Sequence, residues 1–146
     1  MKKFGILVAS ALVMGMSFTS CSSDDDSNNI GSVVGKWEFN TYKYYLNGQF
    51  VSEEAYDDHE PNCAKDYLEI RENGTAKSVD YFGSDCTEFS DESTYTRNGN
   101  TITINDGDST ETVQVLTANS STLVLRYTDT YEGVTAATDV SFTKAQ

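Results

Sequence analysis

The chain has 146 residues, of which 38% are hydrophobic and 12% aromatic, which suits one folded domain with a modest core. After the first 20 residues it carries eight Lys and Arg against 23 Asp and Glu. Such a strong negative charge repels a polyphosphate backbone, which argues against nucleic acid as a partner.

Residues 1–20 have the pattern of a removable secretory signal peptide. Lys2 and Lys3 form a positive start, and the apolar run Phe4 to Met16 follows. This run is shorter than the roughly 20 apolar residues of a membrane-spanning helix. Residues 18–21, Phe-Thr-Ser-Cys, resemble the bacterial lipobox, although Leu is usual in place of Phe. The resemblance implies that Cys21 is lipidated and that its acyl chains anchor the protein in a lipid bilayer.

Residues 21–33 are expected to form a tether. The run from Ser22 to Asn29 is polar and includes three consecutive Asp residues, so it buries nothing. An acidic run directly after the lipidated cysteine resembles the lipoprotein export signal of some Gram-negative gut commensals. That resemblance implies anchoring in the outer membrane with exposure at the cell surface. The alternative is a plain linker on a protein that stays on the periplasmic side.

Two cysteines remain once Cys21 is set aside. Cys63 and Cys86 form an even pair in an oxidising compartment, so we predict a disulfide between them. With His59 as the only histidine, the two thiols would be one ligand short of a tetrahedral metal site.

The folded part, residues 34–146, is predicted to be all-β. No segment of helical length has a sustained 3.6-residue apolar period, whereas short runs with period-two alternation recur. We predict eight strands: Trp37 to Leu46, Tyr67 to Ile70, Thr75 to Phe82, Ser93 to Arg97, Thr101 to Ile104, Thr112 to Leu116, Thr122 to Thr128 and Asp139 to Thr143.

Short turns indicate that neighbouring strands pair antiparallel in chain order. The pairs Asn47-Gly48, Asn73-Gly74 and Asn98-Gly99 accept the positive φ of tight hairpins. Two stretches break the rhythm: Ser52 to Asn62, which is acidic and has room for a short helix, and Gly83 to Glu92. An up-and-down meander of about eight strands can close into a small β-barrel, with an open sandwich as the alternative.

Several short motifs resemble the lipocalin-like lipoproteins of Gram-negative commensals. They are Gly35-Lys36-Trp37, Cys63 before Tyr67 to Ile70, residues 97–104, and Leu116-Thr117 with Thr122 to Arg126. The resemblance implies a lipocalin-like β-barrel with Trp37 across its closed end. Lipocalins often stack a late arginine on this ring, and Arg126 is the matching residue. Alternation places Arg126 on the face opposite Leu123 and Leu125, which argues against that stacking.

Alternation also leaves the first strand unresolved. Trp37 and Phe39 lie on one face, while Tyr42, Tyr44 and Leu46 lie on the other. A β-bulge within the strand would bring both sets to the same face.

The sequence has nine tyrosines, more than core packing requires. A phenol combines an apolar face with a polar tip, which suits an amphipathic ligand or a sugar ring. Alternatively, these tyrosines are ordinary half-buried strand residues. The candidate ligand-binding residues are Trp37, Tyr44, Tyr67, Tyr81, Tyr95 and Tyr127.

We predict neither a catalytic site nor a cofactor. The sequence has no Gly-x-Ser-x-Gly elbow, no His-Glu-x-x-His motif and no phosphate-binding glycine loop. The acidic stretches 53–60 and 106–111 lack a recognised metal-ligand spacing, so no metal site is predicted. Asp108-Ser109-Thr110 resembles a bacterial O-glycosylation motif, which makes Ser109 a candidate for modification.

Two functions follow as hypotheses. The first is an anchored, non-catalytic binding module that holds a small apolar or amphipathic molecule or a glycan fragment in its barrel. The second is an envelope scaffold with a packed barrel whose surface binds a partner protein; an exposed apolar patch would favour it.

Overall fold

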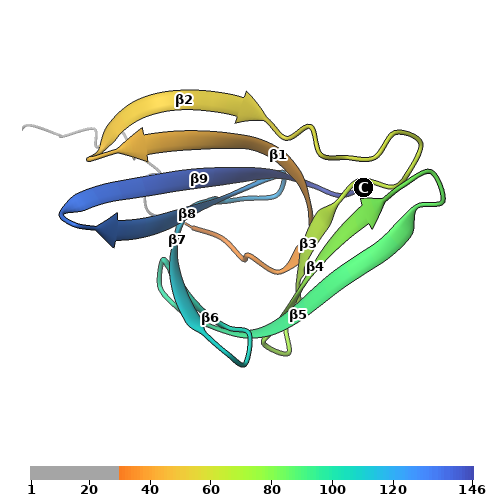
Figure 1. Ribbon diagram of the computed structural model, residues 1–146. Helices are drawn as coiled ribbons and strands as arrows, with labels where there is room; N and C mark the ends of the chain where they lie inside the picture. Colours follow the sequence, from red (N-terminus) through yellow and green to blue (C-terminus); the bar gives the residue numbers. More distant parts are fainter. Residues whose placement is uncertain (1–29) are drawn as a thin grey trace, which may run out of the picture.

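The computed structural model describes residues 30–146, which form an all-β barrel (Figure 1). Strands β3 to β9 pair antiparallel in chain order, and β1 pairs with both β3 and β9, so eight strands close the barrel. The predicted antiparallel meander is therefore confirmed. The strands are β1 (Gly35–Leu46), β2 (Gln49–Ala55), β3 (Tyr67–Ile70), β4 (Thr75–Phe82), β5 (Thr87–Asn98), β6 (Thr101–Asn105), β7 (Thr110–Ala118), β8 (Thr122–Tyr131) and β9 (Val134–Lys144).

The predicted signal peptide and Cys21 lie outside the described residues, as does the tether up to residue 29. From residue 30 onward, no helix is long and apolar enough to cross a membrane.

Strand β2 is additional to the predicted set. It pairs with residues 41–46 of β1, whereas β3 pairs with residues 35–38 of the same strand. The two strands diverge along one edge of β1, and the loop 56–66 connects them. The expected short helix in Ser52 to Asn62 is therefore wrong. Asn47 and Gly48 adopt φ values of 47° and 78°, which turns the chain directly back onto β1.

Two other stretches extend strands beyond the predicted limits. Strand β5 begins at Thr87, inside the stretch expected to be irregular, and pairs along β4. Strands β8 and β9 form a long hairpin that turns at Glu132-Gly133. Both residues of that turn have positive φ, 51° and 81°, and glutamate is an unusual residue there.

The two ends of the barrel differ. The chain segment 30–34 lies across one end, where the Gly31 N–H donates to the Ala118 carbonyl (2.9 Å) and the Arg97 guanidinium donates to the Gly31 carbonyl (2.8 Å). The C-terminus lies at this end too, since the Ala145 N–H donates to the Lys36 carbonyl. We call it the plugged end. The hairpin turns after β1, β4, β6 and β8 lie at the opposite, open end.

The core fills the half of the barrel next to the plugged end. A bulge between Phe39 and Thr41 in β1 shifts the alternation by one residue, as predicted. Tyr42 and Tyr44 consequently join Trp37 and Phe39 on the inner face. The most deeply buried apolar side chains come from β1, β4, β7, β8, β9 and the N-terminal segment: Trp37, Phe142, Leu123, Leu125, Val33, Val79, Val113 and Val115.

Candidate binding site

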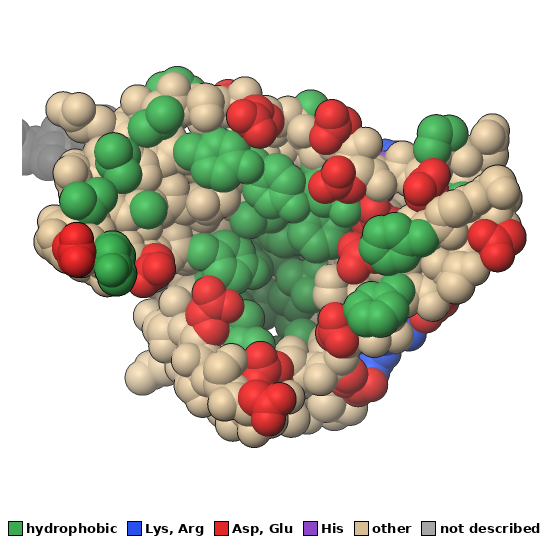
Figure 2. Space-filling view, viewed as in Figure 1, with side chains coloured by type: hydrophobic (Ala, Val, Ile, Leu, Met, Phe, Trp, Pro, Cys, Tyr) green, Lys and Arg blue, Asp and Glu red, His purple; other side chains and the backbone are tan. Residues whose placement is uncertain are grey.

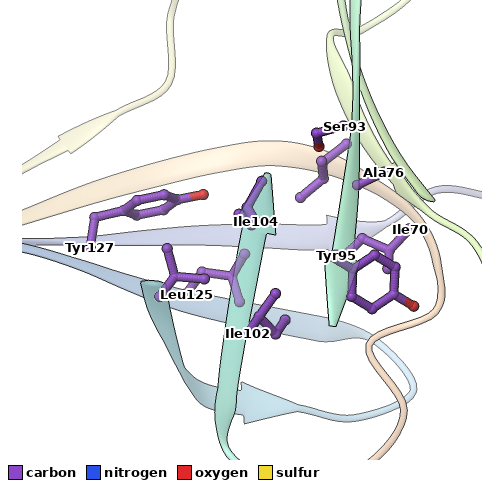
Figure 3. Close-up of a pocket in the computed structure, with 10 residues that line it drawn as sticks. Ile70, Ala76, Ser93, Tyr95, Ile102, Ile104, Leu125 and Tyr127 are labelled. Carbon is purple, nitrogen blue, oxygen red and sulfur yellow. The ribbon is translucent and has the colours of Figure 1, made fainter. Parts of the chain in front are cut away.

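An apolar cavity lies inside the barrel between β3 and β8 (Figure 3). Ala76, Ser93, Tyr95 and Tyr127 contribute to its lining. Its volume is about 50 Å³, whereas pockets for drug-sized ligands have roughly 300–1,000 Å³. The remaining lining residues are the aliphatic side chains of Leu68, Ile70, Ile102, Ile104, Val113 and Leu125.

The space-filling view shows that the barrel is hollowed (Figure 2). Hydrophobic side chains lie within the hollow, and Asp and Glu side chains border it. The barrel therefore offers an apolar interior that is reached past an acidic border.

The two tyrosines of the cavity have different roles. The Tyr95 hydroxyl donates to the Arg71 carbonyl (2.9 Å), which fixes its ring against the wall. The Tyr127 hydroxyl points into the interior (Figure 3). Burial, followed by the nearby Glu111 carboxylate, raises the pKa of Tyr127 to about 12. This phenol therefore stays protonated at neutral pH, as a hydrogen-bond donor inside an apolar site.

An aromatic cluster lines the side of the barrel where β2 and β3 diverge. The Phe39 ring stacks on Tyr56 with centroids 4.9 Å apart and packs against Phe142 at 4.8 Å. The ring centroid of Tyr42 lies 5.8 Å from that of Tyr56 and 6.3 Å from that of Tyr44. These contacts close the gap beside β3 with rings, so the loop 56–66 is part of the barrel wall.

Asp66 holds this loop to the barrel. Its carboxylate is almost fully buried and accepts hydrogen bonds from the Tyr56 hydroxyl (2.7 Å) and the Tyr81 N–H (2.8 Å). The His59 Nδ1 accepts the Asp66 N–H (3.0 Å), and its Nε2 faces the Phe39 carbonyl (3.3 Å). With Nδ1 as the acceptor, Nε2 is the nitrogen that can donate to the Phe39 carbonyl; Nδ1 also lies 3.3 Å from the Asp66 carboxylate.

The disulfide between Cys63 and Cys86 is present, as predicted, with the two Cα atoms 5.4 Å apart. It joins the loop 56–66 to the turn between β4 and β5. Both segments lie at the open end, so the bond fixes one side of the entrance.

Trp37 forms the floor of the barrel. Its side chain is completely buried, and its indole N–H donates to the Val33 carbonyl (2.8 Å). The Lys144 ammonium lies 4.1 Å from the ring centroid and also donates to the Val34 carbonyl. Gly35 has a φ of 148°, and a Cβ there would overlap the Lys144 ammonium. The absence of a side chain at Gly35 thus leaves room for the Lys144 ammonium group that covers the indole.

Arg126 does not stack on Trp37, in agreement with the alternation argument. It lies on the outer face, where it pairs with Asp139 at 2.5 Å and its guanidinium lies 4.8 Å from the Tyr45 ring centroid. The cation on the indole comes from β9 instead, from Lys144.

The structure places the candidate ligand-binding residues in four locations. Tyr95 and Tyr127 line the cavity, and Tyr44 lies on the inner face of β1 nearer the open end. Trp37 lies beneath, at the plugged end. Tyr67 and Tyr81 face outward and do not line the cavity, because they alternate with inward-facing Leu68 and with Asp80. Tyr67 instead packs under the Lys36 ammonium, 3.6 Å from its ring centroid.

Ser109 lies in the exposed turn between β6 and β7. Its hydroxyl donates to the Asp106 carboxylate (2.9 Å), and its N–H donates to the same group (2.7 Å). O-glycosylation at Ser109 stays a prediction from the sequence.

The family model for the lipocalin-like domain matches residues 33–125, more than half of the chain. The chain belongs to the lipocalin-like domain family. No curated protein matches its sequence.

Solved structures share the fold of this lipocalin-like domain. A lipocalin-like protein from Bacteroides uniformis is 21% identical with a TM-score of 0.54, over 79% of this chain and 100% of that one. An uncharacterized protein from Bacteroides eggerthii is 15% identical with a TM-score of 0.51, over 78% of this chain and 100% of that one. At these identities the likeness concerns the fold alone.

Proposed function

We propose that this lipocalin-like domain is a non-catalytic binding module for a small apolar or amphipathic molecule or a glycan fragment. The observation that carries the proposal is the apolar cavity on the inner faces of β3 to β8 beneath the hollow of the open end. Because the cavity alone measures about 50 Å³, the ligand would occupy it together with the hollow above. Tyr127 and Tyr44 would then contact the part nearer the entrance.

The hydrogen bonds of His59, the only histidine in the sequence, argue against its acting as a catalytic base. Both ring nitrogens of His59 face backbone groups, the Asp66 N–H and the Phe39 carbonyl. A general base needs a free nitrogen within hydrogen-bond distance of its substrate. His59 acts here as part of the loop anchor.

Filling the cavity is expected to abolish ligand binding. The test uses the chain from residue 21 onward with Cys21→Ser, so that it carries no lipid, and the neutral fluorescent probe N-phenyl-1-naphthylamine. Ile104 lines the cavity from β6, and Ile104→Trp places an indole in that space. We expect this variant to weaken probe binding by about tenfold or more, since a handful of lost apolar contacts removes over 1.4 kcal/mol.

Thr103→Trp is the matched control, because Thr103 is the neighbouring residue on the outer face of β6. It should bind the probe like the parent chain. Circular dichroism would establish that both variants are folded. Equal probe binding by the two variants would contradict the proposal.

An exposed apolar rim favours a second candidate function, the binding of a partner protein. Phe50 and Tyr131 are 57% and 73% exposed, and five further large apolar side chains on strand segments toward the open end are exposed as well. Such side chains together indicate an interaction surface. A parent chain that binds no probe at all would favour this candidate. The other rim residues are Leu46, Val51, Phe82, Phe89 and Val134.

We further propose that the domain is anchored to the outer membrane through Cys21 and exposed at the cell surface. The support is the signal-peptide pattern, the lipobox-like residues 18–21 and the acidic run after them. The parent chain should incorporate labelled palmitate in cells, and Cys21→Ser should incorporate none. Protease added to intact cells should degrade the domain if it lies on the surface; protection would favour the periplasmic side.

A further inference from the structure

Four acidic residues lie on the inner faces of the strands just above the cavity. Along a strand, residues two apart share a face. Asp91 lies two residues from Ser93, Glu111 two from Val113, and Asp129 two from Tyr127, and all three of those neighbours line the cavity. On β4, Asp80 lies four residues beyond the cavity-lining Ala76. The acids therefore come from β4, β5, β7 and β8 and surround the entrance.

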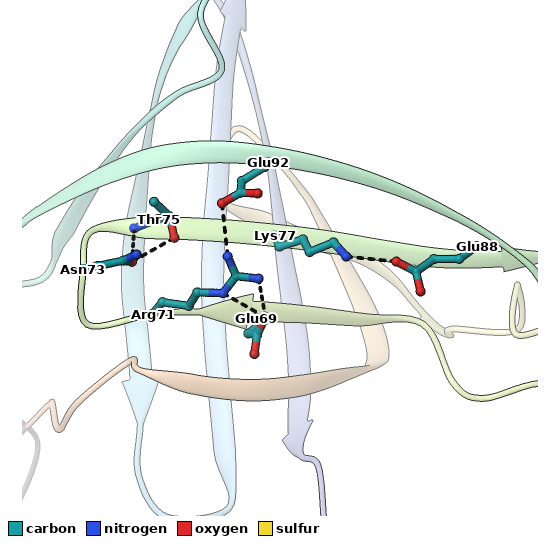
Figure 4. Close-up of polar contacts among 7 residues, drawn as sticks. All are labelled: Glu69, Arg71, Asn73, Thr75, Lys77, Glu88 and Glu92. Atoms are coloured by element: carbon teal, nitrogen blue, oxygen red, sulfur yellow. Dashed lines mark hydrogen bonds and ion pairs between the residues drawn. The ribbon is translucent and has the colours of Figure 1, made fainter.

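No lysine or arginine of residues 30–146 neutralises these acids. Four of the eight basic side chains in this range pair with acids elsewhere on the strands: Lys43 with Glu53, Arg71 with Glu69 and Glu92, Lys77 with Glu88, and Arg126 with Asp139. Figure 4 shows two of these groups, around Arg71 and Lys77, on the outer face of β3 to β5.

The other four basic side chains also contact groups other than these acids. Lys65 pairs with Glu38. Lys36 lies over the outer ring of Tyr67. Arg97 and Lys144 donate to backbone carbonyls at the plugged end. The basic side chains of the domain therefore form their contacts on its outer face and at the plugged end, and none of them pairs with the four acids.

The acids at the entrance repel one another. Burial raises the pKa of Asp80, and the carboxylates of Asp66, Asp91 and Asp58 raise it further. The Glu111 carboxylate acts on Tyr127 inside the cavity in the same direction. A hollow with low-dielectric walls concentrates such a field, so a cation that enters it is stabilised.

The arrangement does not suit a metal ion. Nowhere in the described part of the chain do three carboxylate, histidine or cysteine side chains come together as metal ligands. The acids are spread over four strands, whereas the cavity below them is apolar. A diffuse organic cation attached to an apolar body matches both features.

We propose that the ligand is a cationic amphiphile, whose apolar part occupies the cavity and whose ammonium group lies among Asp80, Asp91, Glu111 and Asp129. This inference rests on the proposed binding function and specifies the ligand class. The rings of Tyr42 and Tyr127 near the entrance add favourable contacts for an ammonium group.

The test compares three ligands with the same ten-carbon chain: decyltrimethylammonium, decyl maltoside and decanoate. Each displaces N-phenyl-1-naphthylamine from the Cys21→Ser chain at low salt, below the concentration at which micelles form. We expect the cation to displace the probe at about tenfold lower concentration than the neutral ligand, with decanoate weakest.

Asp91→Asn with Glu111→Gln should remove most of this preference while the neutral ligand binds as before. The matched control is Glu72→Gln with Glu92→Gln, which changes the net charge equally in the turn after β3 and on the outer face of β5. It should keep the preference. Equal displacement by the three ligands, or a preference that survives in the Asp91 and Glu111 variant, would overturn the inference and leave the binding function intact. Absence of probe binding would overturn the binding function itself.

Discussion

Replacing Trp37 with alanine is expected to lower the free energy of unfolding by about 3–5 kcal/mol. The indole is completely buried, and its removal leaves a cavity in the floor of the barrel. The change also removes the donor to the Val33 carbonyl and the aromatic face under the Lys144 ammonium. Urea denaturation followed by circular dichroism would measure the loss.

Trp37→Phe provides a second measurement if the alanine variant does not fold. It keeps an aromatic ring near Lys144 but lacks the indole N–H, so we expect a smaller loss of about 1–3 kcal/mol. A Trp37→Ala variant within 1 kcal/mol of the parent chain would show that the floor of the barrel does not depend on this residue.

Removing the disulfide by Cys63→Ser with Cys86→Ser is expected to lower the free energy of unfolding by about 3 kcal/mol. The bond closes a segment with a sequence separation of 23 residues, and the unfolded chain gains entropy without it. The loss of stability should be largest in the loop 56–66 and in the turn after β4, because the bond connects these two segments. Urea denaturation would give the total effect.

Hydrogen exchange would locate the effect. We expect the amides of the loop 56–66 to exchange faster in the variant than in the parent chain, while the amides of β8 and β9 stay the more strongly protected ones in both. Reduction of the parent chain with dithiothreitol provides the control that introduces no serine. Unchanged exchange in the loop would mean that Asp66 and the aromatic cluster hold it without the disulfide.

The overall fold was predictable from local signals. Period-two alternation and the Asn-Gly turns define most of the meander, because both act between residues close in sequence. Strand β2 escaped prediction because Ser52, Glu53 and Glu54 have little strand preference of their own. Their conformation comes from pairing with β1, which the preceding turn imposes. The predicted strands were shorter than β8 and β9, because the turn between these strands contains Glu132 at positive φ and glutamate is not a typical turn residue.

The candidate site was predictable in part. Residue type alone selected the tyrosines, and alternation was needed to separate Tyr95 and Tyr127 on the inner face from Tyr67 and Tyr81 on the outer face. The buried role of Asp66 had no sequence signal, because it depends on the path of the loop 56–66. The aliphatic lining residues, such as Ile104 and Leu125, cannot be told from ordinary core residues in the sequence, because only the closed barrel shows that they border a cavity.

The position of the chain ends has a consequence for how a ligand would arrive. Residue 30 lies at the plugged end, and β1 alone, with 12 residues, extends about 40 Å at 3.3 Å per residue. In a protein anchored through Cys21, the tether would therefore join the domain at the plugged end, opposite the entrance. An entrance at the end away from the point of attachment favours capture of molecules dissolved in the surrounding medium over extraction of lipids from the membrane.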